Sequence, residues 1–274
     1  MEAFGMYRAF AQKLRAHAVM MTNLRHSGHV GSSLSMADIL AVLFLKTLRI
    51  DPKDPAWAGR DRFILSKGHA AAAVYASLAE RGFIPMEWLK TYYCDEGKLS
   101  GHISHHVPGV EFSTGSLGHG LPVLCGMALA ARRAKKPHRL IALVSDGDCD
   151  EGSTWEAIMF AAQQHLNNVT VIVDYNQVQA LGHSKDVIDL EPFAKKLEDF
   201  GWAVKEIDGH DFAAIESALS SLPFQKGKPS WLIARTVKGK GIKSIENTVS
   251  CHYSCIPDDK LAAAYRELGV DYAS

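Results

Sequence analysis

The chain has 274 residues, 47% of them hydrophobic, and its formal net charge is zero. Such a chain can bury one large core, and its unbroken alternation of helix and strand patterns favours a single domain over residues 1–274. A neutral chain lacks the excess of basic residues that nucleic-acid binding favours. No apolar run approaches the roughly 20 residues of a membrane span. The five cysteines are odd in number and lack the regular spacing of a disulfide framework, which is typical of a reducing compartment. We therefore expect a cytoplasmic protein that binds neither nucleic acid nor a membrane.

The predicted elements alternate between helices and strands along the chain. Ser35 is expected to open one helix, and Pro122 lies in the first turn of another. The stretch 95–119 is rich in Gly, His and Ser, and loops of that length inside compact domains are usually functional. In chain order the patterns predict a helix at 4–24, a glycine- and serine-rich loop at 26–34, a helix at 36–47, a strand at 62–65, a helix at 69–80, a further helix from Pro85, a helix at 122–134, strands at 140–144 and 169–173 with a helix between them, a strand at 202–207, a helix near 212–221, a strand at 231–235 and a last helix after Pro257.

Two short apolar runs, at 140–144 and 169–173, are rich in β-branched residues and have the pattern of buried strands. The residues between them have a helical pattern, with a capping box of Ser153 and Glu156 at its start and a turn at Asn167-Asn168 after its end. Strands joined by such a helix cross over right-handed and become parallel neighbours. The sequence therefore predicts an α/β fold in which helices flank both faces of a parallel β-sheet.

Polar side chains follow both of these strands. Asp146 comes directly after the first strand and Asn176 comes after the second. Because parallel strands end at the same edge of a sheet, the two side-chain oxygens are expected to meet where open α/β sheets bind ligands. A few hard oxygen ligands of low total charge suit Mg²⁺, which usually completes its coordination with water and phosphate oxygens. The expected ligand is a diphosphate.

Two other interpretations of this segment stay open on these residues alone. Asp146, Asp148 and Asp150 have the spacing of the start of a calcium loop. That loop needs glycine where Glu151 stands and glutamate where Ala157 stands. The segment could also be a solvated acidic loop that stabilises the dipole of the following helix.

Six blocks, in the same order over nearly the whole chain, resemble transketolases. One of them, Ser145-Asp146-Gly147 followed about thirty residues later by Asn176, resembles the thiamine diphosphate motif. The resemblance is to the diphosphate-binding domain of this family in its split form, and it implies a thiamine diphosphate-binding fold. The blocks are 25–33 (RHSGHVGSS), 61–70 (DRFILSKGHA), 101–102 with 108–111, 114–120 (TGSLGHG), 145–147 with 174–178, and 236–241 with Glu246, Asn247 and His252.

The resemblance implies thiamine diphosphate and Mg²⁺ as cofactors, with Ca²⁺ or Mn²⁺ as possible substitutes for Mg²⁺. Its metal ligands would be Asp146, Asn176 and the backbone carbonyl of Val178. Glu151 and Glu156 match carboxylates at a subunit interface that couples two active sites, although first-turn helix charges would explain them equally. The residues implied in cofactor binding are His69, Gly115, Leu117, Gly147, Glu151, Asn176 and His252.

The same resemblance implies four catalytic histidines among the 13 of the chain. His69 and His252 would touch the diphosphate, His29 and His252 would face the substrate carbonyl, and His102 would bind the first hydroxyl of a ketose donor. Transfer of a ketol unit makes and breaks alkoxides, which requires groups that exchange protons near neutral pH. The remaining histidines that we considered are expected to be structural: His17, His138, His165 and His210.

The implied reaction moves a two-carbon ketol unit from a ketose, phosphorylated or similarly anionic, to an aldose. Transketolases activate their cofactor with a glutamate on a second domain, for which this sequence has no counterpart. We therefore expect a separate pyrimidine-binding subunit, two copies of each chain in the complex, and no activity of this chain alone.

Alternatives are another thiamine-dependent enzyme, a nicotinamide dehydrogenase, or a regulatory subunit that keeps the fold without catalysis. The spacing of Gly115, Gly118 and Gly120 is not that of a dinucleotide fingerprint.

Three features depart from the family pattern. Ser145 replaces the first glycine of the cofactor motif, and Asp148-Cys149-Asp150 differs from the usual sequence before Glu151. After Gly101-His102, where the family has proline, the chain continues with residues 103–106, which include two extra histidines, His105 and His106. These histidines could mark an unusual substrate or could face solvent. The sequence does not say which sugar reacts or whether it carries a phosphate or a sulfonate.

Overall fold

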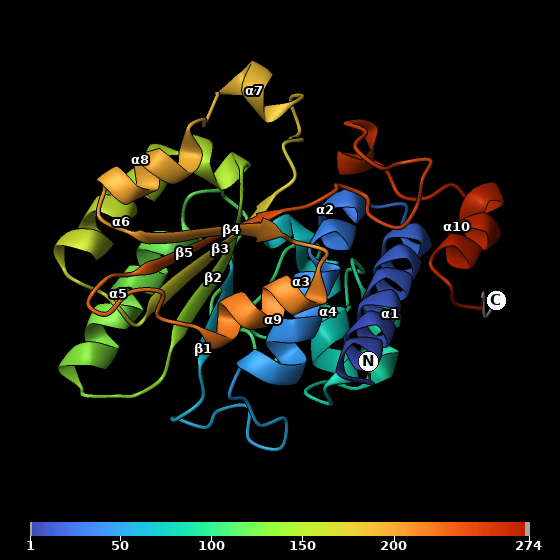
Figure 1. The fold of residues 1–274 in the computed structure, drawn as a ribbon. Helices are drawn as coiled ribbons and strands as arrows, with labels where there is room; N and C mark the ends of the chain where they lie inside the picture. The colour runs from blue at the N-terminus through green and yellow to red at the C-terminus, as the bar shows by residue number, and fades with distance from the viewer. Residues whose placement is uncertain (1, 272–274) are drawn as a thin grey trace.

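The fold is built on a five-stranded parallel sheet in the order β1-β2-β3-β5-β4 (Figure 1). The computed structural model describes residues 2–271, so residues 1 and 272–274 of the expected domain lie outside the described part. One row of the sheet joins Leu65, Leu143, Ile172 and Leu232, all of them buried. The strands are β1 (Arg62–Leu65), β2 (Leu140–Ser145), β3 (Val169–Tyr175), β4 (Ala203–Asp208) and β5 (Ser230–Arg235).

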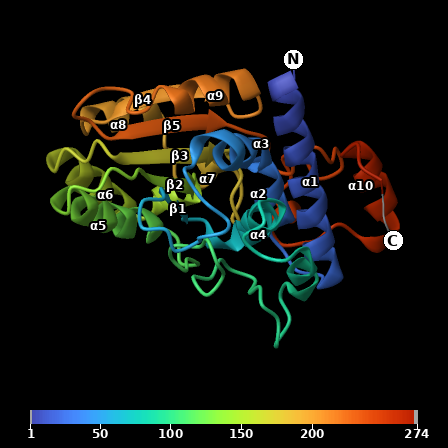
Figure 2. The same cartoon turned by 90° about the horizontal axis from the view of Figure 1, so that it is seen from below.

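Helices cover both faces of this sheet, which confirms the predicted fold class (Figures 1 and 2). Leu143 packs into the core on one face, while its neighbours Ala142 and Val144 pack into the core on the other. A parallel sheet buried on both faces has continuous apolar strands, and the fully buried β2 and β3 follow this rule. One face carries α1 (Glu2–Leu24), α3 (Ala37–Val42), α4 (Ala71–Glu80) and α9 (Phe212–Ser220), and the other carries α5 (Gly120–Arg133), α6 (Gly152–Gln163) and α8 (Phe193–Asp199).

A third apolar cluster holds the C-terminal part of the chain against the first helices. In it, α10 (Leu261–Glu267) packs on α1 and on α2 (Val30–Ser35), through side chains such as Leu34 and Leu261. Both views place α10 on the side of α1 that faces away from the sheet (Figures 1 and 2). The segment between β5 and α10 therefore passes close to α2. Within residues 2–271, no helix has both the length and the apolar character needed to cross a membrane.

The region around Ser35 differs from the prediction. Part of the expected loop at 26–34 forms α2, and Ser35 ends this helix and does not open the next one. The Ser35 hydroxyl donates to Asp174, a buried residue on β3, and this tertiary bond replaces the expected capping bond. The helix predicted at 36–47 is α3 continued by the π-helical turn η1 (Leu43–Thr47).

The predicted capping box of α6 is also wrong. The helix starts at Gly152 with Glu151 as its N-cap, and no side chain caps it. The Ser153 hydroxyl donates to the carbonyl of Gly118 at 2.8 Å and so ties the helix to the loop before α5. A local pattern cannot reveal this partner, because Gly118 lies 35 residues earlier in the chain.

The remaining differences concern short elements. Two short helices, α7 (Ser184–Val187) and α8, are not predicted by the sequence. A 3-10 helix, η3 (Met86–Thr91), stands where a further helix was expected, and η2 (Gly68–Ala70) forms the first turn before α4. As expected, the described residues between η3 and α5 form no long element. Other 3-10 turns are η4 (Gly147–Asp150), η5 (Ser250–His252) and η6 (Asp258–Lys260).

Substitution of two glycines by alanine should have opposite effects on stability. A Cβ added to Gly68 would lie 2.2 Å from the Thr114 carbonyl oxygen, whereas Gly126 is exposed on α5 with open space around it. We expect Gly68→Ala to lower the free energy of unfolding by about 1–3 kcal/mol through overpacking. Gly126→Ala should raise it by about 0.5–1 kcal/mol through helix propensity. Urea unfolding of both variants tests this, and equal shifts would contradict the close packing at Gly68.

Candidate active site

The carboxyl ends of β1, β2, β3 and β5 surround a cavity of about 110 Å³. The residues that follow β2 and β3, Asp146 and Asn176, both line it, as the strand-end argument expects. Val178 also belongs to the lining, so the three residues expected to hold the metal lie at one cavity. The full lining consists of Ser32, Lys67, His69, Leu117, Ser145, Asp146, Gly147, Asn176, Val178, Gln179, Ala180, Lys238 and His252.

The oxygens of Asp146 and Asn176 are held in place by protein donors. One carboxylate oxygen of Asp146 accepts the backbone N–H of Gly147 at 3.0 Å, and the other accepts the Ser184 hydroxyl at 2.7 Å. The side-chain oxygen of Asn176 accepts the backbone N–H of Val178 at 3.1 Å. These bonds leave lone pairs on each oxygen, since a carboxylate or amide oxygen can accept more than one bond.

The electrostatics of Asp146 suit a cation. Burial raises the pKa of this carboxyl to about 6, and the charge of nearby Asp174 adds to the rise, although the hydrogen bond from Ser184 opposes it. A positive ion next to Asp146 would favour the charged form. Carboxylate, amide and carbonyl oxygens form a hard donor set that fits Mg²⁺.

Lys238 is a buried cation at the same cavity. Its side chain is 2% exposed, and its ammonium donates to the Val178 carbonyl at 2.6 Å and lies 3.0 Å from His252 Nδ1. Burial lowers the pKa of Lys238. Within the described part of the chain it forms no ion pair, and a buried charge normally has a partner. An anionic ligand in the cavity would supply this partner, so Lys238 fits a diphosphate.

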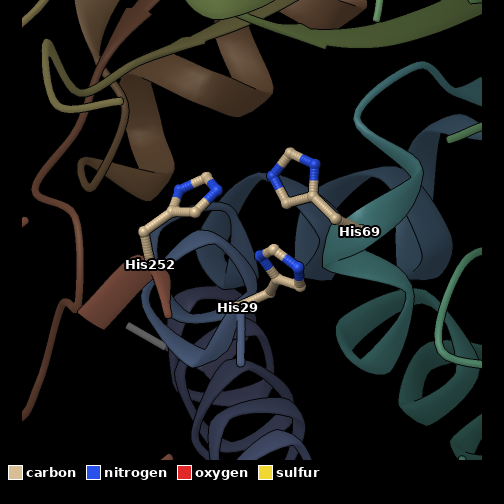
Figure 3. A group of neighbouring side chains, drawn as sticks. All are labelled: His29, His69 and His252. Carbon is tan, nitrogen blue, oxygen red and sulfur yellow. The ribbon is translucent and has the colours of Figure 1, made fainter. Parts of the chain in front are cut away.

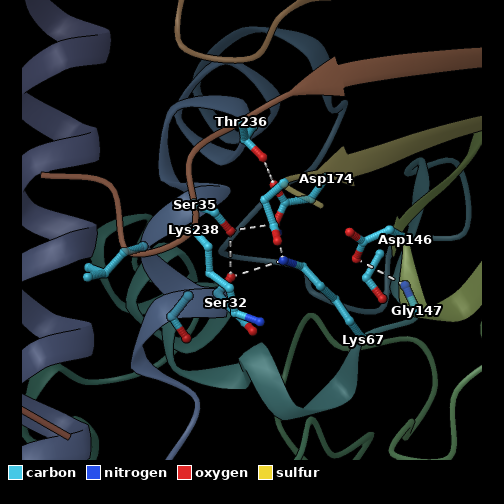
Figure 4. Close-up of polar contacts among 12 residues, drawn as sticks. Ser32, Ser35, Lys67, Asp146, Gly147, Asp174, Thr236 and Lys238 are labelled. Carbon is cyan, nitrogen blue, oxygen red and sulfur yellow. Dashed lines mark hydrogen bonds and ion pairs between the residues drawn. The ribbon is translucent and has the colours of Figure 1, made fainter. Parts of the chain in front are cut away.

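A second buried lysine, Lys67, forms an ion pair with Asp174 (Figure 4). Asp174 also accepts the hydroxyls of Ser35 and Thr236 and, at 3.3 Å, the side-chain amide of Asn176. Burial pushes the pKa of Asp174 upward, but the Lys67 ammonium and the hydroxyl donors hold it below its usual value. This network fixes the end of β3, and with it the position of Asn176.

Three of the predicted catalytic histidines lie together (Figure 3), and two of them, His69 and His252, line the cavity. The ring centroid of His29 lies 4.8 Å from that of His69 and 4.9 Å from that of His252. The backbone N–H of His29 donates to the His252 carbonyl at 2.9 Å, which joins the start of α2 to η5. The Nδ1 atom of His29 is buried and has no hydrogen-bond partner among the described residues. It is free to bond to a ligand.

These three imidazoles are neutral at pH 7. Burial lowers the pKa of His29 to about 4 and that of His252 to about 3, and neighbouring positive charges strengthen both shifts. Burial also lowers the pKa of His69, and further causes are repulsion from His29 when that ring is protonated and the charge of Lys67. A neutral imidazole offers one proton donor and one acceptor, which suits it to move a proton to or from a substrate hydroxyl.

The lowered histidine pKa values predict a loss of stability in mild acid. Between pH 6.5 and 4 the unfolded chain binds a proton at His29 that the folded chain does not, so folding stability falls as the pH falls through this window. His29→Asn should remove this contribution and narrow the loss of Tm between pH 7 and pH 4.5 relative to the wild type. Thermal unfolding at both pH values measures it. Identical pH profiles for the two proteins would mean that His29 keeps an ordinary pKa.

The other predicted site residues lie around this group. His102 is exposed, and its ring centroid is 6.0 Å from that of His29. A Cβ on Gly115 would lie 3.3 Å from the His102 ring, so these two residues are neighbours. Leu117 and Gly147 line the cavity. Glu151 and Glu156 are exposed and lie outside the cavity lining, and their predicted role at an interface stays a prediction.

The unusual Ser145 and Asp148 form a bonded pair. The Ser145 hydroxyl donates to Asp148 at 2.9 Å, and Asp148 also accepts the Ser66 hydroxyl at 2.6 Å and the Gly118 backbone N–H at 3.0 Å. The side chain of Asp148 is fully buried. Because protein donors occupy its oxygens, Asp148 ties the cofactor motif to the loop before α5 and does not act as the second ligand of a calcium loop.

The extra histidines of the 95–119 stretch are exposed. The rings of His105 and His106 lie tilted against each other with centroids 4.1 Å apart, and Nδ1 of His105 lies 2.7 Å from the Ser113 hydroxyl. Neither lines the cavity. Both histidines therefore face solvent in this structure.

Sequence reasoning missed the two buried lysines. Lys67 follows β1 by two residues and Lys238 follows β5 by three, so both stand at the edge where Asp146 and Asn176 were expected. The rule that located Asp146 and Asn176 would have located the lysines if it had been applied to every strand.

Comparisons with known proteins agree with this geometry. The family model described as "Transketolase, thiamine diphosphate binding domain" matches residues 6–274. The chain is 42% identical over 255 residues to an apulose-4-phosphate transketolase subunit from Actinobacillus succinogenes, covering 93% of this chain and 92% of that protein. It is 39% identical over 242 residues to a 6-deoxy-6-sulfo-D-fructose transketolase subunit from a Clostridium species, covering 88% of each chain.

Solved structures lead to the same family. The transketolase of Campylobacter jejuni superposes with a TM-score of 0.93 at 32% identity, and the chain covers 43% of that protein. The transketolase of Leishmania mexicana superposes with a TM-score of 0.92 at 29% identity, with 41% of its length covered. The chain thus spans about two fifths of these transketolases but nearly the whole length of the relatives named as subunits. It belongs to the transketolase family, and it carries that family's thiamine diphosphate-binding domain.

Proposed function

We propose that this chain is the diphosphate-binding subunit of a split transketolase, which moves a two-carbon ketol unit from a ketose to an aldose. The observation that carries the proposal is one cavity, in the described part of the chain, that is lined by hard oxygen ligands, a buried ammonium without an ion pair and two neutral imidazoles. The third imidazole, His29, lies beside these two. Membership in the transketolase family supports it. We take residues 1–274 to act as one diphosphate-binding domain, because a single sheet organises the described residues.

The cofactors are thiamine diphosphate and Mg²⁺, with Ca²⁺ or Mn²⁺ as possible substitutes. Asp146, Asn176 and the Val178 carbonyl would hold the metal ion, the carbonyl through the lone pair that its bond from the Lys238 ammonium leaves free. Lys238 would bind the diphosphate together with His69 and His252, since an ammonium and two imidazoles supply donors to phosphate oxygens. Gly147, which has no side chain, would let the diphosphate come close to the backbone. When bound, thiamine diphosphate supplies a nucleophilic carbon that carries the ketol fragment.

The residues of this chain would bind the sugar and move its protons. His29 lies beside His69 and His252 and has an Nδ1 atom without a partner among the described residues and a lowered pKa, so it can take a proton from a substrate hydroxyl and return it. His69 and His252 flank it and are neutral for the same reason, burial. His102, exposed beside this group, would donate to or accept from the terminal hydroxyl of the ketose. Gly115 and Leu117 would pack on the aminopyrimidine ring.

We propose a separate pyrimidine-binding subunit, which supplies the activating glutamate. The relatives of similar length are themselves named as transketolase subunits, which supports a second subunit in this protein too. The complex would hold two copies of each chain, with the exposed Glu151 and Glu156 at its interfaces. The five cysteines are all free, which suits the cytoplasm.

The substrate is proposed to be an anionic sugar. Two relatives are named for apulose 4-phosphate and for 6-deoxy-6-sulfo-D-fructose, the first a phosphate and the second a sulfonate, and both are negatively charged. We place the negative group of the sugar away from the reacting carbonyl, toward the rim of the cavity and the partner. The choice of donor and acceptor would then depend on both chains.

A ketol-transfer assay tests the proposal. The purified chain with thiamine diphosphate and Mg²⁺ is expected to show no transfer with ketose phosphates and sulfoketoses. Addition of the pyrimidine-binding subunit, co-purified from the native cells, should restore it. Transfer by the chain alone would contradict the need for a partner. A complex that binds the cofactor but transfers no ketol unit would favour a regulatory role.

A further inference from the structure

His210, expected to be structural, links two parts of the molecule that meet near the cavity. It lies in the turn between β4 and α9, and its side chain is 14% exposed. Its Nδ1 atom is 2.7 Å from a carboxylate oxygen of Asp38 on α3. Its Nε2 atom accepts the backbone N–H of Val237 at 2.9 Å, in the segment after β5. One ring thus joins α3 to the segment that carries Lys238.

The partners of the ring determine its tautomer. A backbone N–H can only donate, so Nε2 of His210 must be the acceptor. The ring proton is then on Nδ1, from which it is donated to Asp38. Asp38 is 5% exposed and is itself held by Arg15, whose two terminal nitrogens lie 2.9 and 2.6 Å from its two oxygens. This bidentate pair fixes the carboxylate and with it the plane of the imidazole.

The segment that His210 holds is tied down at three consecutive residues. Thr236 donates its hydroxyl to Asp174, and the backbone N–H of Val237 donates to His210. Lys238 then extends into the cavity, where its ammonium contacts the Val178 carbonyl and His252. The position of the ammonium therefore depends on the position of the backbone at Val237. Figure 4 shows Thr236 and Lys238 close to the Asp174 network.

We propose that Arg15, Asp38 and His210 are positioning residues that set the place of the Lys238 ammonium and thereby the affinity for the diphosphate. This inference rests on the proposed function, since it takes Lys238 as a diphosphate ligand. The Nε2 atom of His210 accepts the N–H of Val237 and so holds the backbone directly. The N–H at Nδ1 donates to Asp38 and only orients the ring, so it affects the affinity for the diphosphate through the position of Nε2.

Two substitutions separate these roles. In His210→Gln the amide can place an acceptor near the position of Nε2 and keep the bond to Val237, while the bond to Asp38 is lost. In His210→Asn the amide can place a donor near the position of Nδ1 and keep the bond to Asp38, while the bond to Val237 is lost. Each variant loses one hydrogen bond, so the two should lose similar stability. The control is His165→Asn, the same change at an exposed histidine that does not line the cavity, and it should behave like the wild type.

The readouts are the KM for thiamine diphosphate and the kcat of the complex with its partner subunit, and binding of magnesium pyrophosphate to this chain by calorimetry. We expect His210→Asn to raise the KM for the cofactor and the Kd for pyrophosphate about five- to tenfold, the effect of one lost hydrogen bond, with a small change in kcat. His210→Gln should stay within about twofold of the wild type. In a Lys238→Met background the difference between Asn and Gln should vanish.

Two results would overturn the inference. Equal affinity of the Asn and Gln variants, with lowered Tm in both, would mean that His210 only supports the fold. A difference that persists without Lys238 would mean that His210 acts on another ligand. Failure of the proposed function itself appears separately, because the wild-type complex would then show no dependence on thiamine diphosphate.

Discussion

Replacement of Asp146 by Asn should weaken the binding of thiamine diphosphate in the presence of Mg²⁺ by at least about 100-fold, because loss of a direct metal ligand costs more than the 10- to 100-fold typical of its supporting partners. The carboxylate is 2% exposed, and its pKa is raised to about 6 by burial. Without a metal ion this buried charge is a cost to the fold. The Asn side chain removes the charge and can still accept the N–H of Gly147.

Asp146→Asn should therefore affect the Tm differently without and with the cofactor. In metal-free buffer the Tm of Asp146→Asn should equal or exceed that of the wild type. On addition of Mg²⁺ and thiamine diphosphate, only the wild type should gain stability, since a ligand stabilises the state that binds it. Asp186→Asn, which removes an exposed carboxylate two residues after Ser184, serves as the matched control and should behave like the wild type. An equal gain in Tm for Asp146→Asn and the wild type would place the metal site elsewhere.

The second large effect concerns the ion pair of Lys67 and Asp174. Both side chains are at most 1% exposed, and removal of one partner leaves the other charge buried without its pair. We expect Lys67→Met and Asp174→Asn each to lower the free energy of unfolding by about 3–5 kcal/mol. The double variant has neither charge, and Asn at 174 can still bond to the hydroxyls of Ser35 and Thr236. It should recover much of the loss.

A double-mutant cycle in urea measures this coupling without any cofactor. The double variant should be more stable than the sum of the single losses predicts, by about 2 kcal/mol or more, since neighbours in one network do not act additively. Lys195 and Asp199, an exposed pair one turn apart on α8, supply the control cycle, for which about 0.3–0.5 kcal/mol is expected. Additive losses at Lys67 and Asp174 would contradict a tight ion pair.

The apolar pattern of the strands predicted much of the fold, because this pattern can be recognised in the sequence without knowledge of tertiary contacts. The run at 62–65 forms β1 with the predicted bounds, and apolar runs at 140–144 and 169–173 form β2 and β3, two interior strands of the sheet, each slightly longer than expected. A strand buried on both faces has no polar positions, so its apolar run is visible without knowledge of its neighbours. The same pattern placed Asp146 and Asn176 at one edge.

Features that depend on distant partners were not predictable in this way. Ser35 has the sequence position of a helix cap, but its hydroxyl bonds to Asp174, which lies 139 residues later. Ser153 fits a capping box, but it bonds to Gly118. Lys238 contributes an ordinary positive charge to the composition, and only the fold shows that this charge is buried beside a carbonyl and an imidazole. Polar residues whose partners come from the tertiary structure are those that sequence patterns misplace.

Native mass spectrometry of the tagged chain, captured from its own cells in Mg²⁺ and thiamine diphosphate, tests most directly whether this chain forms one half of a thiamine diphosphate enzyme. We predict a complex of two copies of this chain and two of a partner, with two bound cofactors that are lost when Asp146 is replaced by Asn. A homo-oligomer of this chain that carries no thiamine diphosphate would contradict the account.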